Sequence, residues 1–168
     1  MGRLMRILRH RWFDETDTRR ALGEDALDRL AQRVKDSESR HHGEIRVCVE
    51  AGLPLSYLWR GATARERAVA VFAKLRVWDT EANNGVLIYL LLAEHAIEIV
   101  ADRGVSRHVA PEYWARILDD MRADFRAGRY EAGLGRAVDA VDHILLQHFG
   151  RSPGSPDRDE LPDRPALL

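Results

Sequence analysis

A nearly continuous run of apolar residues, bounded by turn residues, constrains the fold of this chain more than any other feature. The run covers residues 86–92, Val-Leu-Ile-Tyr-Leu-Leu-Leu, and follows the turn sequence Asn83-Asn84-Gly85. The longest apolar stretch around it, from Gly85 to Ala93, is only about half as long as a membrane-spanning helix requires. The run is typical of a central strand buried on both faces. Residues 96–102 follow so closely that antiparallel pairing with this run is expected. The sequence therefore predicts a sheet with residues 86–92 at its centre.

Apolar periodicities on either side of this run complete a mixed pattern of helices and strands. Helical spacing predicts helices over residues 23–39 and 63–75, from Pro111 to near Gly128, and over 130–149. Strict alternation predicts a strand over residues 44–50 with one face buried more deeply than the other. This order of elements suits a sheet that is covered on both faces. We therefore expect an α/β fold, a three-layer α/β/α sandwich with a central mixed sheet.

The composition divides the chain into three regions. Residues 1–21 form a basic N-terminal arm or short helix, and residues 22–150 form one globular domain. Residues 151–168 hold four of the six prolines and almost no large apolar side chains. Such a composition cannot bury enough apolar surface to fold, so we expect this Pro-rich tail to be disordered.

The charge balance of the chain argues against binding of nucleic acid. Lys and Arg total 26 against 27 Asp and Glu, so no overall positive field attracts phosphate backbones. No segment has the pattern of a secretory signal or a transmembrane helix, and a cytoplasmic location is therefore expected.

Residues 1–12 intersperse basic with apolar side chains. This pattern predicts weak contact with an anionic membrane surface. The alternative is a short helix or arm that packs on the domain. The basic residues are Arg3, Arg6, Arg9 and Arg11.

Oxygen-bearing side chains recur along the turn that precedes the central strand. Ligands at alternate positions of such a turn can converge on a hard divalent cation, calcium or magnesium. The turn begins like an EF-hand loop, but Asn84 replaces the glycine at the sixth position and Leu90 replaces the bidentate glutamate at the twelfth. The alternative is a turn whose side chains cap backbone groups. The candidate ligands are Asp79, Glu81, Asn83 and Asn84 of the turn and Asp102, which ends the strand over residues 96–102.

Asp102 and Arg103 end the second strand of the predicted antiparallel pair, where clefts commonly form in α/β sheets. If Asp79 borders the same cleft, two carboxylates could hold a metal that polarises a phosphate ester while Arg103 counters its charge. An ion pair between Asp102 and Arg103 is the simpler alternative. Asp79, Asp102 and Arg103 are thus the candidate catalytic residues of a metal-assisted phosphatase.

Histidine and cysteine residues give weaker signals. His41, His42 and Glu44 lie close in sequence, but they lack the one-face helical spacing of a zinc protease site, and a solvated loop is favoured. Cys48 stands alone between valines in an apolar strand, which favours a buried structural thiol.

Three segments of the sequence resemble the TPM domain family. The longest covers residues 77–105, from Val-Trp-Asp-Thr-Glu-Ala-Asn-Asn-Gly-Val through Ile-Glu-Ile-Val-Ala-Asp-Arg-Gly-Val. Residues 125–134, Phe-Arg-Ala-Gly-Arg-Tyr-Glu-Ala-Gly-Leu, look like the motif that joins the last two helices of that family. Residues 43–45, Gly-Glu-Ile, look like the opening of its first strand. The resemblance covers roughly residues 22–149.

The resemblance implies a compact α/β/α sandwich and a choice among several functions. Members of the family have been linked to acid phosphatase activity, calcium binding, photosystem II repair and receptor modulation, so the fold alone does not select one. This chain looks like the short cytoplasmic bacterial branch, without a signal peptide or a C-terminal membrane helix. By position, the resemblance implies a site at Asp79, Asn83, Asn84, Asp102 and Arg103, with Glu44 and Glu81 as secondary candidates.

Two functional hypotheses follow. The first is a domain that binds a divalent cation or an unidentified protein partner, without a reaction of its own. The alternative is an acid phosphatase that acts on phosphate monoesters with the help of a metal, for which the sequence offers no nucleophile or general acid.

Overall fold

A mixed sheet of four strands forms the middle of the molecule in the computed structural model, which describes residues 2–152 and 160–168, without the side chains of Arg3 and Glu15. The strand order is β3-β2-β1-β4. β1 (Glu44–Glu50) and β2 (Gly85–Leu91) are parallel, and β3 (Ala96–Ala101) pairs antiparallel with β2. The short strand β4 (Ala166–Leu167) lies parallel to β1 at the edge. The predicted mixed sheet with residues 86–92 at its centre is confirmed.

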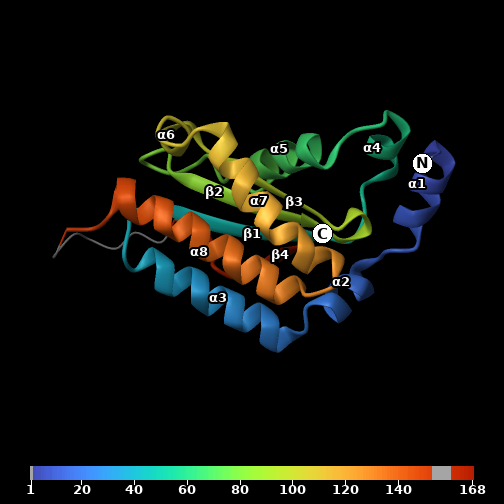
Figure 1. Ribbon diagram of the computed structural model, residues 1–168, viewed down its shortest axis with the longest axis horizontal. Coiled ribbons are helices and arrows are strands. Elements are labelled where there is room, and N and C mark those ends of the chain that lie inside the picture. Colours follow the sequence, from blue (N-terminus) through green and yellow to red (C-terminus); the bar gives the residue numbers. More distant parts are fainter. Residues whose placement is uncertain (1, 153–159) are drawn as a thin grey trace.

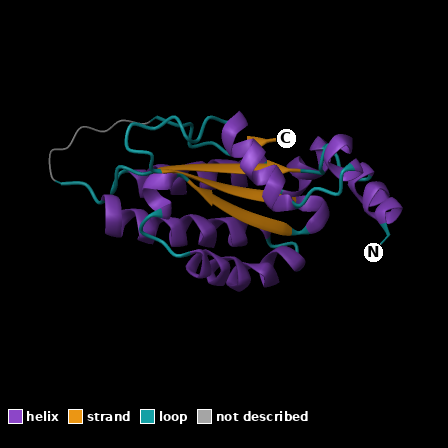
Figure 2. Ribbon diagram, turned by 90° about the horizontal axis from the view of Figure 1, so that it is seen from above, coloured by secondary structure: helices purple, strands orange, loops and turns teal. Residues whose placement is uncertain are grey.

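Helices cover both faces of this sheet (Figures 1 and 2). On one face lie α3 (Glu24–Glu38), α7 (Pro111–Arg126) and α8 (Tyr130–Phe149). On the other face lie α4 (Leu55–Trp59) and α5 (Ala64–Lys74). The α/β/α expectation is therefore confirmed. The remaining elements are α1 (Arg3–Arg11), α2 (Glu15–Ala21), the 3₁₀ turn η1 (Leu92–Glu94) and α6 (Arg103–Ser106).

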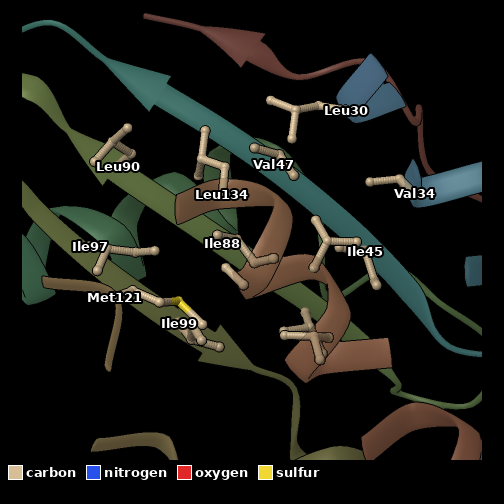
Figure 3. Packing of buried hydrophobic residues seen from close by; sticks show 14 of the residues in the cluster. Leu30, Val34, Ile45, Val47, Ile88, Leu90, Ile97, Ile99, Met121 and Leu134 are labelled. Carbon is tan, nitrogen blue, oxygen red and sulfur yellow. The ribbon is translucent and has the colours of Figure 1, made fainter. Parts of the chain in front are cut away.

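Alternate residues of each strand point into two separate cores. In the larger core, Ile45 and Val47 of β1 and Ile88 of β2 pack toward Leu134 of α8 and Met121 of α7 (Figure 3). Leu87, Tyr89 and Leu91 of β2 point to the opposite face, where they pack with α5. Both faces of β2 are therefore buried, which explains its uninterrupted apolar sequence.

β1 is buried more completely than its alternating sequence predicts. All of its residues are buried, including the charged residues Glu44, Arg46 and Glu50. Glu50 forms a bidentate ion pair with Arg67 of α5, at 2.6 Å, and accepts a hydrogen bond of 2.5 Å from the hydroxyl of Tyr89. The polar face of the strand is therefore covered by protein that supplies partners for its charges.

The C-terminal segment provides part of this cover, and the expectation of a disordered tail over 151–168 is wrong for residues 160–168. Leu168 donates a backbone hydrogen bond of 2.9 Å to Val49, and Leu161 is buried. Arg46 of β1 donates to the carbonyl oxygens of Pro162 and Arg164. Composition misses this segment because backbone pairing with a sheet edge, rather than apolar bulk, holds most of it. Residues 153–159 lie outside the described part of the chain.

The N-terminal region consists of two helices, of which α1 is attached to the domain by polar contacts and by Ile7, which packs against the second core. Arg6 donates to the carboxylate of Glu94 at 2.7 Å, and the His10 ring lies 2.9 Å from the same oxygen. Because the amide of Leu53 donates to Nδ1 of His10, the proton of this ring lies on Nε2 and is donated to Glu94. These two partners lower the pKa of Glu94 to about 2. None of the helices described is long and apolar enough to cross a membrane.

The buried Arg67–Glu50 pair predicts a large loss of stability when it is broken. Arg67→Ala leaves the carboxylate of Glu50 buried with Tyr89 as its remaining partner, and we expect the free energy of unfolding to fall by about 3–5 kcal/mol. The matched control is Arg122→Ala, which removes the exposed pair with Asp119 and should cost under about 1 kcal/mol. Urea unfolding of both variants measures the difference, and equal losses would contradict this account.

Candidate functional site

The predicted site residues gather at one end of the sheet because of strand register. Glu44, the first residue of β1, lies opposite Gly85, the first residue of β2. β3 runs in the other direction, so Ala101 pairs with Val86 and the chain leaves β3 beside the start of β2. The turn over residues 79–84 and the segment 102–104 therefore meet at this end, which we call the turn end of the sheet.

Two glycines allow the backbones of these segments to touch. A Cβ atom at Gly85 would overlap the carbonyl oxygen of Val77, and one at Gly104 would overlap that of Asn83. The amide of Gly104 donates to the carbonyl of Asn83 at 2.9 Å, and Asn83 itself adopts a positive φ of 53°, a conformation that asparagine tolerates. The sequences Asn-Asn-Gly and Asp-Arg-Gly are thus fitted to each other across the turn end.

Asn84 is the most buried of the predicted ligands, with 1% of its surface exposed. Its side-chain amide donates to the carbonyl of His42 at 2.6 Å, and its backbone amide donates to the hydroxyl of Thr80 at 3.1 Å. These contacts fix the direction of the side chain. Its oxygen, Oδ1, is buried and has no hydrogen-bond partner within the described part of the chain.

Asp102 caps the short helix α6 and leaves one oxygen unused. Oδ1 accepts a hydrogen bond of 2.6 Å from the backbone amide of Arg103, whereas Oδ2 is buried without a hydrogen-bond partner among the described residues. The simple ion pair between Asp102 and Arg103 is not what forms, because the guanidinium of Arg103 donates to the side-chain oxygen of Asn83 at 3.1 Å.

Asp79 and Glu81, the acidic residues of the turn, are held in different ways. The carboxylate of Asp79 is about half exposed and forms an ion pair of 2.5 Å with Arg76. The backbone amide of Glu81 donates to the carboxylate of Glu160 in the C-terminal segment, at 3.0 Å. The structure therefore brings Asn83 into contact with Arg103, next to Asp102, and places Asn84 at the same end of the sheet with its side chain on the carbonyl of His42. It directs the carboxylate of Asp79 toward Arg76.

No group of three His, Cys, Asp or Glu side chains is placed to hold a metal ion in the described ranges. His41 is buried, with its Nε2 2.9 Å from the hydroxyl of Ser37, and burial lowers its pKa to about 4. Burial likewise raises the pKa of the Cys48 thiol to about 12, so this cysteine is a structural group. A cation at the turn end would depend on amide and backbone oxygens in addition to Asp102.

The model of the TPM domain matches residues 16–144. The chain belongs to the TPM domain family. The resemblance in residues 77–105 and 125–134 is thereby confirmed, and the turn end of this TPM domain is built from the longer of those segments.

Solved structures share the fold of this TPM domain. The BA42 protein from the psychrophilic bacterium Bizionia argentinensis is 25% identical, with a TM-score of 0.75 over 88% of this chain and 95% of that chain. The N-terminal domain of a protein from P. gingivalis is 23% identical, with a TM-score of 0.60 over 78% of this chain and 82% of that chain, and it shows the fold alone. A search of curated proteins finds no match.

A cleft of this TPM domain lies away from the turn end. It has a volume of about 1000 Å³ and lies between α3 and α8, lined by several arginines and acidic residues. Arg29 pairs with Glu131 and Arg33 with Asp139, each at 2.6 Å. Because these charges neutralise one another across the cleft, we interpret it as a helix–helix contact held by surface ion pairs rather than as a reaction site.

A cluster of carboxyl groups beside the turn end has no local signal in the sequence. Glu38, at the end of α3, accepts a hydrogen bond of 2.7 Å from the backbone amide of Ile45. Burial, the nearby charge of Glu44 and contact with Asp163 raise the pKa of Glu38 to about 9 despite that amide. The amide of Leu161 donates to Glu44 at 3.1 Å. Asp163 lies more than 100 residues from Glu38 and Glu44 in the sequence, so periodicity and spacing do not reveal the cluster.

The raised pKa of Glu38 predicts a stability that falls with rising pH. The native state keeps a proton that the unfolded chain releases near pH 4.5, so this contribution is complete below that pH and is lost as the pH rises toward about 9. Urea unfolding between about pH 5 and pH 9 should show the decline in the wild type and a smaller decline in Glu38→Gln. The exposed residue Glu112 provides the control, since Glu112→Gln should keep the wild-type slope.

Proposed function

We propose that this TPM domain is a binding domain that holds a divalent cation at the turn end of the sheet, between Asn84 and Asp102. One observation carries the proposal: Oδ1 of Asn84 and Oδ2 of Asp102 are both buried, and neither has a hydrogen-bond partner in the described part of the chain. A buried oxygen without a partner costs about 1–3 kcal/mol, and more when it is charged. A bound cation would offset that cost.

The chemistry of the available oxygens favours calcium over magnesium. Calcium accepts amide, carbonyl and carboxylate oxygens in a flexible arrangement, whereas magnesium demands near-ideal octahedral geometry. The backbone oxygens of Ala82 and Asn83 both face Gly104, close to Asp102. Asp79 and Glu81 belong to the same turn and would add charge if Asp79 exchanged Arg76 for the cation. With Asp102 as the firmest charged ligand, weak binding is expected.

The same contacts give less support to the metal-assisted phosphatase. That reaction needs Asp79 and Asp102 on one metal and Arg103 on the phosphate ester. In the structure Asp79 pairs with Arg76 and Arg103 with Asn83. We therefore place cation binding first and keep phosphate-ester hydrolysis as the alternative. The experiments below distinguish the two.

The proposal predicts that calcium stabilises metal-stripped protein. The melting temperature should rise with calcium, and less with magnesium, because a ligand that binds only the native state raises its stability. Asp102→Asn keeps the size of the side chain and removes its charge, so the rise should disappear. Glu112→Asn, at an exposed position, is the control and should keep the full rise.

A second measurement separates binding from catalysis. The same preparations are assayed with p-nitrophenyl phosphate, and no turnover above the protein-free rate is expected. Metal-dependent turnover that Asp102→Asn abolishes would replace the binding domain with a phosphatase. If no divalent cation shifts the melting temperature, the cation site is wrong.

A further inference from the structure

Helix α1 contacts the domain through Arg6, Ile7 and His10, while its other large apolar side chains face outward. Arg6 and His10 both contact Glu94, and His10 is 4% exposed. Leu4, Leu8 and Trp12, which share one stripe of the helix at intervals of four, are 77%, 55% and 83% exposed. A surface helix of a globular protein normally has the opposite orientation.

Helix α4 adds exposed apolar side chains next to α1. The two helices lie next to each other at one end of the molecule (Figure 1), and Arg6 donates to the carbonyl of Ala62, just after α4, at 2.7 Å. Leu55 and Trp59 of α4 are 55% and 68% exposed. We call the combined set the α1–α4 apolar surface, which consists of Leu4, Met5, Leu8, Trp12, Leu55 and Trp59.

The two segments that build this surface contain basic residues and no acidic ones. Residues 1–13 and 51–65 include no Asp or Glu. Arg11 and Arg60 are exposed there, and the guanidinium of Arg60 lies 4.4 Å from the centre of the Tyr57 ring. The sequence predicted a membrane contact through all four N-terminal arginines, but Arg6 is bound to Glu94 and does not take part in it. The side chain of Arg3 lies outside the described part of the chain. The surface therefore combines an apolar centre with a positive border.

We propose that the α1–α4 apolar surface docks on the surface of an anionic lipid bilayer, with α1 lying in the plane of the interface. Leucine and methionine side chains would enter the boundary of the acyl chains, and the two tryptophans would sit at headgroup level, where amphipathic rings are favoured. Arg11 and Arg60 would face lipid phosphates and add electrostatic attraction to the apolar contact.

Charge favours lipid over a second copy of the chain. A symmetric dimer through this surface would bring the same patch of both copies together, and Arg11 and Arg60 would then face like charges. An anionic bilayer instead complements both the apolar centre and the positive border. The docked protein would also leave the turn end accessible, because that end lies at the start of β1, whereas His10 contacts Gly52 just beyond its last residue.

Vesicle flotation of the full chain tests the proposal. We expect flotation with mixed phosphatidylcholine and phosphatidylglycerol vesicles at about 0.1 M salt, and much less at about 1 M salt or with phosphatidylcholine alone. Trp12→Ser and Leu8→Ser should each weaken partition about tenfold. Trp78→Ser is the matched control, because Trp78 is 49% exposed and belongs to neither segment, and it should float like the wild type.

Two readouts keep the test decisive. Melting temperatures must match the wild type, and since Trp12 is 83% exposed its replacement should leave the fold intact even if Leu8→Ser does not. The proposal is overturned if the wild type does not float, or if Trp12→Ser floats as well as the wild type. Two other results would assign the surface to a protein partner and overturn the proposal as well. One is a dimer that forms without lipid and that Trp12→Ser dissociates, and the other is capture of polyglutamate without flotation.

Discussion

The charged side chains of β1 are the constraint on which much of this structure depends. Glu44, Arg46 and Glu50 lie on a strand whose every residue is buried, and a buried charge is tolerated only when it has partners. Arg67 of α5 forms an ion pair with Glu50, and carbonyl oxygens of the C-terminal segment accept hydrogen bonds from Arg46. The position of α5 and the path of residues 160–168 follow from these requirements as much as from apolar packing.

The parts of the fold that sequence predicts well are those with a local signal. The apolar run of β2 and the helical spacing of α3 and α8 report burial within one element. Pro111 marks the start of α7. β4 carries no such signal, because its two residues depend on an edge formed over 100 positions earlier. The orientation of α1 is likewise hidden, since amphipathic spacing shows that two sides exist and not which side faces the domain.

The residues of the candidate site likewise divide into those that the sequence places correctly and those that it does not. Asn83, Asn84 and Asp102 could be placed together from the sequence because strand pairing alone brings the start of β2 beside the end of β3. Asp79 has its partner at Arg76, three residues away, and that local contact competes with any shared ligand role. Glu38 and Asp163 could not be anticipated, because their contact depends on where the C-terminal segment crosses the end of α3.

The late position of residues 160–168 in the chain has a consequence for synthesis on the ribosome. The amide of Leu161 reaches Glu44 across 117 residues, and Arg46 finds the carbonyl of Pro162 across 116. Until those residues emerge, the nascent chain carries an open strand edge and an arginine without its final partners. Open edges are templates for pairing with other chains. Residues 160–168 thus cover one edge of β1 that stays open to intermolecular pairing until this segment is translated.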